Sequence, residues 1–161
     1  MKCDMNRQEF RDLAEEKIII LDGATGSNLI KAGMPSGVCP EKWIIDNPDA
    51  LINLQREYVA AGSNIVLAPT FTGNRIKLSD YGLEEEIVSI NKRLVEISKE
   101  AVNGKAYVAG DISMTGQSLK PIGNMIFEDL VDIYKEQARI LADAGVDLFI
   151  IETMRRPAIF L

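Results

Sequence analysis

The sequence predicts an α/β fold in which parallel strands alternate with helices. Four short apolar runs each stop at a polar residue, as a buried strand does at the rim of a parallel sheet. A segment with helical periodicity separates each run from the next. The chain has 161 residues, whereas a complete (β/α)8 barrel needs roughly 250, so its length is typical of half a barrel. The runs are residues 18–21, 65–68, 107–109 and 148–151.

The amino-terminal stretch is polar with one apolar side, which predicts a short helix on the outside or bottom of the core. We therefore expect residues 1–17 to be a helical extension of a main domain at 18–154. The first run, residues 18–21, is short and β-branched and precedes Asp22 and Gly23, which predicts a buried strand. Residues 33–40 are rich in Gly, Pro and Ser and predict a loop. The apolar side of the first helix carries Phe10, Leu13 and Ala14.

The next helix has clear start and stop signals. Asn47 suits the N-cap, Pro48 the first helical position and Asp49 the positive end of the helix dipole. Gly62 suits the C-cap. One apolar face is expected from Leu51, Leu54, Tyr58 and Ala61.

Two further helices are predicted by apolar stripes with a spacing of three and four residues. The third helix ends at Asn103-Gly104 and the fourth before Gly145. Right-handed connections of this kind make all four strands parallel. The stripes are Ile87, Ile90, Leu94, Ile97 and Ala101, then Leu130, Tyr134, Ala138, Leu141 and Ala144.

Composition excludes several classes of function. The net charge is −6, which argues against nucleic acid or an anionic membrane as the main partner. No apolar segment resembles a signal peptide or the roughly 18 residues of a membrane span, so we expect a cytoplasmic protein. Histidine is absent, which excludes Ser-His-Asp and Cys-His mechanisms within this chain. Cys3 and Cys39 match neither a disulfide framework nor a metal-ligand spacing.

Polar residues gather where the predicted strands end, which is where parallel α/β folds bind ligands. Asp22 and Glu152 close the first and fourth strands and would face one mouth in a barrel. Two carboxylates there could bind an ammonium group or a metal, or act as an acid/base pair, although Asp22 could instead cap its own turn. The expected rim residues are Asp22, Thr70, Asp111, Ser113, Glu152 and Thr153.

The alternation alone fits both half a barrel and an open doubly wound sheet. The first turn, Asp22-Gly23-Ala24-Thr25-Gly26, has its glycines at the wrong offsets for a dinucleotide fingerprint and carries a carboxylate. Dinucleotide binding is therefore disfavoured. Gly23 and Gly26 do let the backbone approach a ligand, and exposed N–H groups there could hold a carboxylate.

A series of motifs in a fixed order resembles a known family. They are Ile-Leu-Asp-Gly-Ala-Thr-Gly-Ser (20–27), Cys-Pro-Glu-Lys-Trp (39–43), Asp-Asn-Pro (46–48), Glu-Tyr-Val-Ala-Ala-Gly-Ser-Asn-Ile-Val (57–66), Thr-Phe-Thr-Gly-Asn-Arg-Ile-Lys-Leu (70–78), Tyr-Gly-Leu-Glu (81–84) and Ile-Glu-Thr-Met (151–154). From about residue 18 to 154 the chain resembles the amino-terminal half of the homocysteine S-methyltransferase domain. It is most similar to the homocysteine-binding module of bacterial cobalamin-dependent methionine synthases.

The resemblance implies the first four strands of a TIM (β/α)8 barrel that binds homocysteine at its carboxyl-end mouth. In this family zinc holds the homocysteine sulfur as a thiolate, which attacks a methyl group, and methionine is formed. A free thiol has a pKa of about 8.5, so metal binding is what deprotonates it at neutral pH. The resemblance also implies a methyl-donor module, bearing cobalamin or methyltetrahydrofolate, as a partner in the parent enzyme.

Site residues follow from the resemblance position by position. Asp22, with the backbone of Gly23 and Ala24, would hold the amino-acid end of homocysteine, and Glu152 would pair with its ammonium group. The same comparison implies a pocket wall made of Thr70, Phe71 and Ser113. It assigns no catalytic group and no metal ligand to this chain.

The sequence also departs from the family pattern. The three zinc-binding cysteines of the family lie in the second half of the barrel, and Cys3 and Cys39 match none of them. Residues 155–161 form an atypical tail in which Pro157 discourages a further helix. We therefore expect a fragment or truncated product that does not transfer methyl groups by itself.

Two alternatives remain open at this level. One is a catalytically inactive half-barrel that folds or acts only as a homodimer or with a partner chain, because the outer strands would be open edges. The other is a metal-free barrel lyase or aldolase. It is disfavoured because no Lys stands at a strand end to form a Schiff base.

Overall fold

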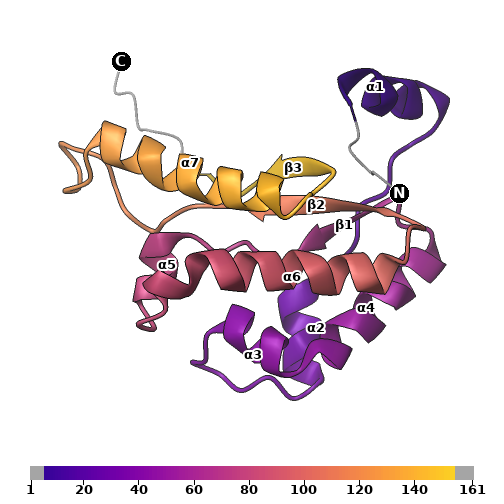
Figure 1. Ribbon diagram of the computed structural model, residues 1–161, viewed down its shortest axis with the longest axis horizontal. Coiled ribbons are helices and arrows are strands. Elements are labelled where there is room, and N and C mark those ends of the chain that lie inside the picture. The colour runs from indigo at the N-terminus through magenta and orange to yellow at the C-terminus, as the bar shows by residue number, and fades with distance from the viewer. Residues whose placement is uncertain (1–5, 155–161) are drawn as a thin grey trace.

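The computed structural model, which describes residues 6–154, contains a parallel three-stranded sheet of order β1-β2-β3. β1 is Ile65–Ala68, β2 is Tyr107–Ile112 and β3 is Leu148–Ile151. Helix α6 (Ile87–Val102) connects β1 to β2, and α7 (Phe127–Asp143) connects β2 to β3 (Figure 1). The predicted alternation of parallel strands and helices is thus confirmed for three of the four runs.

The prediction of a buried strand at residues 18–21 is wrong. Leu21 makes one parallel bridge to Ile65, and the Ile20 carbonyl oxygen accepts from the N–H groups of Asn64 at 2.7 Å and Ile65 at 3.3 Å. The run therefore lies along the free side of β1 without becoming a full strand. No described segment covers its other side, so Ile18 is 86% exposed and the sheet has three strands where four were expected.

Five shorter helical segments and one 3-10 turn complete the described chain. The amino-terminal helix α1 is confirmed and begins with a capping box, in which the Asn6 side chain accepts from the backbone N–H of Glu9. It buries no side chain and lies beyond the amino ends of the strands (Figure 1). The short segments α2, α3, α5 and η1 were not predicted as helices. The segments are α1 (Arg7–Glu16), α2 (Thr25–Lys31), α3 (Pro40–Asp46), α4 (Pro48–Ala61), α5 (Arg75–Ser79) and η1 (Glu84–Glu86).

The predicted helix ends agree with the structure. α4 begins at Pro48 and ends before Gly62, whose φ of 110° is left-handed. α6 ends before Asn103, also left-handed at φ 46°. All five residues of the predicted α6 stripe are buried. On α4 the buried face is shifted, because Ala61 is exposed and Gln55 is buried in its place.

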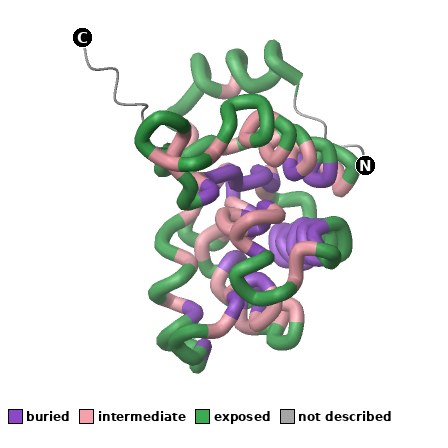
Figure 2. Tube along the Cα trace, turned by 90° about the vertical axis from the view of Figure 1, so that its left-hand side faces the viewer, coloured by how far each residue is buried: buried purple, intermediate pink, exposed green. Residues whose placement is uncertain are grey.

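Two apolar clusters share helix α6. One fills the space between α6 and the helices α2, α3 and α4. The other joins one face of the sheet to α6 and α7 and includes Val108 and Ile112 of β2. Buried segments accordingly gather at the centre of the molecule, whereas outer turns are exposed (Figure 2). Side chains alternate along a strand, so Asp111, between Gly110 and Ile112, points away from α6 and α7.

Some predictions fall outside the described residues. Cys3 and the tail at 155–161 belong to this group. The division into an extension at 1–17 and a main domain stays a prediction. None of the helices in residues 6–154 combines the length and the hydrophobicity that a membrane-spanning helix requires.

Candidate functional site

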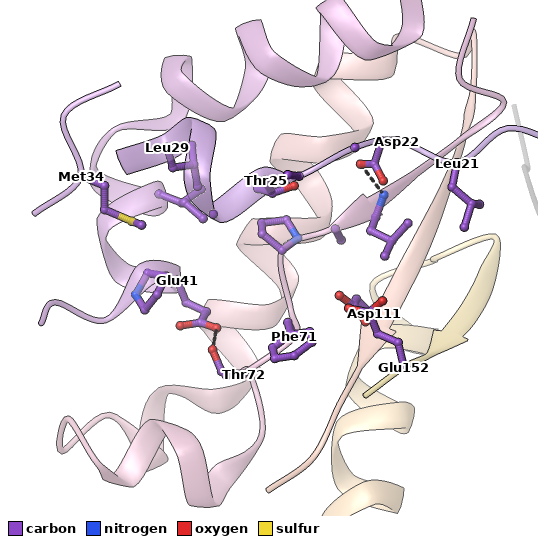
Figure 3. Close-up of a pocket in the computed structure, with 18 residues that line it drawn as sticks. Leu21, Asp22, Thr25, Leu29, Met34, Glu41, Phe71, Thr72, Asp111 and Glu152 are labelled. Atoms are coloured by element: carbon purple, nitrogen blue, oxygen red, sulfur yellow. Dashed lines mark hydrogen bonds between the residues drawn. The ribbon is translucent and has the colours of Figure 1, made fainter. Parts of the chain in front are cut away.

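A cavity of about 660 Å³ opens at the carboxyl ends of the strands (Figure 3). Its walls come from the loop after residue 21, the start of α2, α3, the segment after β1, and the ends of β2 and β3. The lining residues are Leu21, Asp22, Gly23, Ala24, Thr25, Gly26, Leu29, Met34, Pro40, Glu41, Ile44, Leu67, Ala68, Pro69, Phe71, Thr72, Asp111 and Glu152. Among these residues are four carboxyl groups and no Lys or Arg.

Asp22 directly follows residues 18–21, the run that lies beside β1. Its Oδ2 accepts a hydrogen bond of 3.0 Å from the backbone N–H of Leu67, so the side chain ties the first turn to the neighbouring strand. The pKa of Asp22 is raised to about 6: burial is the main cause and the charge of Glu152 adds to it, while backbone hydrogen bonds from Leu67 and from Asp22 itself oppose the rise. A carboxyl group with this pKa titrates just below neutral pH.

Asp111 is the most enclosed carboxyl group of the three at the strand ends. It is 5% exposed, and its Oδ1 has no hydrogen-bond partner within the described chain. Burial, followed by the charges of Glu152 and Asp22, raises the pKa of Asp111 to about 7. Its backbone is held by Thr70, whose Oγ1 accepts from the Asp111 N–H at 3.0 Å and donates to the Asp111 carbonyl at 2.8 Å.

Glu152 follows β3 directly. Its backbone N–H donates to the Ile112 carbonyl oxygen at 3.1 Å, which extends the β2–β3 pairing by one residue. The residue as a whole is exposed, at the open side of the cavity. Figure 3 shows the Glu152 and Asp111 carboxyl groups next to each other, with Asp22 across from them. Three carboxyl groups from three separate elements therefore face one space.

The loop with Gly23 and Ala24 is packed tightly against α4. The Ala24 carbonyl oxygen accepts from Tyr58 Oη at 3.0 Å and from Asn28 Nδ2 at 2.7 Å. A Cβ at position 23 would lie 2.9 Å from Cε1 and Oη of Tyr58, so only glycine fits there without moving the ring. At Gly26, by contrast, an added Cβ would meet no atom within 4 Å.

Buried amide side chains hold the end of β1 in place. Gln55 Nε2 of α4 donates to the Leu67 carbonyl oxygen at 3.0 Å, and Gln137 Nε2 of α7 donates to the Thr70 carbonyl oxygen at 2.8 Å. Both side chains are fully buried. Because these bonds join outer helices to strand ends, the rim of the cavity is set by long-range contacts.

The opposite wall contains a second buried carboxyl group, Glu41 of α3, which is 2% exposed. The Thr72 hydroxyl donates to Glu41 Oε1, and the Cys39 thiol donates to Oε2 at 3.3 Å. Burial and the neighbouring Glu41 charge raise the pKa of Cys39 to about 11. The thiolate form of Cys39 is thus strongly disfavoured at neutral pH.

The sequence-predicted residues divide into two groups. Asp22, Gly23, Ala24, Phe71 and Glu152 are brought together around the cavity.

Thr70 and Ser113, expected as pocket wall, are fully buried and lie outside the lining. Thr70 stands behind the cavity and holds the β2 backbone, because its hydroxyl points to the neighbouring strand. Sequence reasoning placed Asp111 on the rim but gave it no role, and it gave none to Glu41. Two sequence features could have identified them: Asp111 is a charged residue inside an apolar strand, and Glu41 lies in the Cys-Pro-Glu-Lys-Trp motif.

The described residues do not fit a zinc site. Between residues 6 and 154, no group of three or more His, Cys, Asp or Glu side chains is arranged to hold a metal ion. Cys39 is turned into the protein toward Glu41 with its proton retained. The cavity is instead suited to a small cationic group beside the three strand-end carboxyls, with apolar surface on Leu29, Met34 and Ile44.

Comparison with known proteins gives consistent results. The sequence model of the family described as homocysteine S-methyltransferase matches residues 19–158. The methionine synthases of Mycobacterium tuberculosis and Mycobacterium leprae are 27% and 28% identical to the chain, over 90% and 86% of its length. The chain spans only 13% and 12% of those two proteins.

Among solved structures, the homocysteine methyltransferase MmuM from Escherichia coli has a similar fold. Its metallated form matches with a TM-score of 0.76 at 20% identity, covering 90% of this chain and 57% of that one. Its oxidized form matches with a TM-score of 0.75. The three-stranded sheet and its helices therefore correspond to part of the fold of that methyltransferase.

Proposed function

The chain belongs to the homocysteine S-methyltransferase family, and from this premise we propose that its cavity is a homocysteine half-site. In the complete reaction the homocysteine sulfur would accept a methyl group to give methionine. The observation that carries the proposal is the meeting of Asp22, Asp111 and Glu152 at one end of the cavity.

The ammonium group of homocysteine is the part that these carboxyl groups would recognise. An ammonium group offers three N–H donors and no acceptor, so its best partners are carboxylates in a poorly hydrated space. Glu152 would pair with it from the open side and Asp22 from the first turn. A cavity without a lining Lys or Arg has no competing cation.

The homocysteine carboxylate would bind the backbone of the first turn. Gly23 and Ala24 line the cavity, and the contact of Gly23 with Tyr58 keeps this turn close to α4. Backbone N–H groups in such turns bind anions without adding a charge. The absence of a side chain at position 23 lets a ligand approach the main chain directly.

Zinc and the methyl donor would come from outside residues 6–154 in this proposal. The described residues do not fit a zinc site, so we derive no step of methyl transfer through them. Family membership implies that zinc would deprotonate the homocysteine thiol, and that a cobalamin- or methyltetrahydrofolate-bearing module would supply the methyl group. The part we assign to this chain is to bind and orient the amino-acid end of homocysteine.

Thermal unfolding with and without L-homocysteine tests the proposal. A ligand at 100 times its dissociation constant adds about 2.7 kcal/mol to the free energy of unfolding, or roughly 5–10 °C for a chain of this size. 4-Mercaptobutyrate, which keeps the thiol and the carboxylate but lacks the ammonium group, should give no shift. Glu152→Gln should lose the response to homocysteine, whereas Glu57→Gln on the exposed face of α4 should keep it. Equal responses to the two ligands would contradict the proposed recognition.

We propose in addition that a second copy of the chain pairs with the open edges of the sheet. The supporting observation is the exposure of apolar side chains at both edges: Ile18 is 86% exposed beside β1, and Ile151 is 66% exposed on β3. Open strand edges of this kind favour pairing with another chain. Sedimentation velocity across a hundredfold concentration range should show a dimer that Ile151→Lys weakens. Val88→Lys, at an exposed α6 position, is the matched control, and a monomer at all concentrations would contradict the pairing.

A further inference from the structure

Asp111 differs from the other two strand-end carboxyls in having lost its solvent without gaining a partner. The residue is only 5% exposed, and its Oδ1 forms no hydrogen bond with any described residue. Leaving a buried polar atom unpaired is costly. The cost is smaller when the carboxyl group is protonated and neutral, and a cationic ligand can supply the missing hydrogen bond.

Among the described residues, the charged side chains that line the cavity with Asp111 are all acidic. Asp22 faces it from the first turn and Glu152 from the end of β3, and both charges act on it. The neighbouring end of β1 contributes Leu67 and Ala68, which carry no charge. The helices α6 and α7 pack on the other face of β2, and Glu41 lies in the opposite wall. A third negative charge is thus strongly disfavoured while the cavity holds no cation.

We propose that Asp111 is the proton-exchanging residue of this site: it holds a proton in the free protein and releases it when a primary ammonium group binds between Asp111, Asp22 and Glu152. This inference rests on the proposed function for the identity of the ligand, homocysteine. The ammonium group keeps its three protons, and each N–H donates to one of the three carboxylates. The proton of Asp111 passes to the solvent, and no covalent bond of the ligand changes.

Coupled proton release makes affinity depend on pH. Above pH 7 Asp111 is largely ionised and binding requires no proton loss. Below pH 7 the affinity should fall up to tenfold for each pH step, because each bound ligand displaces a proton. With a free-protein pKa of about 7 for Asp111, this residue alone should raise the dissociation constant of homocysteine about 25-fold from pH 7.5 to 5.5, and Asp22, with a pKa of about 6, should multiply the rise a few-fold. In Asp111→Asn the same change should be only a few-fold and should come from Asp22.

Calorimetric titration with L-homocysteine measures the released protons directly. Titrations at pH 7.0 in phosphate and in imidazole, whose ionisation enthalpies differ, should give about half a proton released by Asp111, and those at pH 6.0 should give nearly one from Asp111 and about half a proton more from Asp22. Asp111→Asn should release much less. Asp143→Asn, an exposed carboxylate at the end of α7, should behave as wild type. Binding of wild type without proton release would overturn the proposal and leave the proposed function standing.

A measurement on the free protein separates this inference from the ligand's identity. With 13C-labelled aspartate, the Asp111 carboxyl resonance should titrate with a midpoint near 7 and should move to lower pH in excess methylammonium, which presents the ammonium group alone. If methylammonium lowers the midpoint and homocysteine does not bind, the proposed function fails and the role of Asp111 stands. A midpoint near 4 in the free protein overturns the role of Asp111.

Discussion

Asp111→Asn should change how the stability of the protein depends on pH. The pKa of Asp111 is raised from 3.8 to about 7 in the folded protein. Between these values the folded protein holds a proton that the unfolded chain has lost, so stability falls as the pH rises from about 4 to 7. At about 1.4 kcal/mol for each factor of ten in the proton affinity, the full loss is about 4 kcal/mol. The asparagine variant keeps the shape of the side chain and lacks this titration.

The expected magnitude is smaller than that upper figure, because solvent in the cavity mouth screens the charges. From pH 5 to pH 8 wild type should lose about 3 kcal/mol through Asp111 before screening, and about 1.5 kcal/mol after it. For a chain of this size 1.5 kcal/mol corresponds to roughly 3–6 °C in melting temperature. Between pH 5 and pH 8 the stability of Asp111→Asn relative to wild type should therefore increase by this amount.

Urea unfolding at pH 5, 6, 7 and 8 is the assay, with the midpoint and slope fitted at each pH. Asp143→Asn is the control for removing one acidic group at an exposed position. Asp22, whose pKa is about 6, remains in both proteins, so it lowers the stability of each as the pH rises. Parallel stability profiles for wild type and Asp111→Asn would show that Asp111 is ionised throughout, and would refute the reasoning.

Three further changes have defined outcomes. Gly23→Ala should lower homocysteine affinity at least tenfold in calorimetry, because the new Cβ would lie 2.9 Å from the Tyr58 ring; Gly26→Ala, with nothing within 4 Å, should not. Leu94→Ala should reduce the free energy of unfolding by about 3 kcal/mol in urea, because this fully buried α6 residue leaves a cavity. Thr70→Val should cost about 2 kcal/mol by the same assay, since the β2 N–H loses its acceptor; a loss below 0.5 kcal/mol would contradict that role.

The helix ends and the buried helix face were predicted correctly where short stretches of sequence mark them. Asn47-Pro48 and Gly62 marked the ends of α4, and the α6 stripe identified a buried helix face. Both depend on backbone conformation and on the 3.6-residue period, which short stretches of sequence carry. The first strand failed for the opposite reason. Residues 18–21 have the composition of a strand, but strand pairing depends on distant segments. Within the described chain only Leu21 forms a bridge, to Ile65, and most apolar side chains of the run stay exposed.

The candidate site was predictable only in part. Asp22, Gly23 and Glu152 were found because strand ends and family motifs mark them in sequence. Thr70 was placed in the pocket wall, yet its hydroxyl turns to the β2 backbone. Nothing local in the sequence distinguishes these two orientations, because the partner is 41 residues away.

The sequence by itself determined the alternation of strands and helices, the helix ends and the family. The first depends on short-range periodicity, the second on capping residues and the third on ordered motifs. Only the tertiary structure decided that Asp111 is enclosed, with no partner for its Oδ1 within the described residues, while facing Asp22 and Glu152. These properties depend on desolvation and on charges brought together from distant segments. Such interactions arise when the strands pack side by side, and for that reason the chemistry of the cavity could not be predicted from the sequence alone.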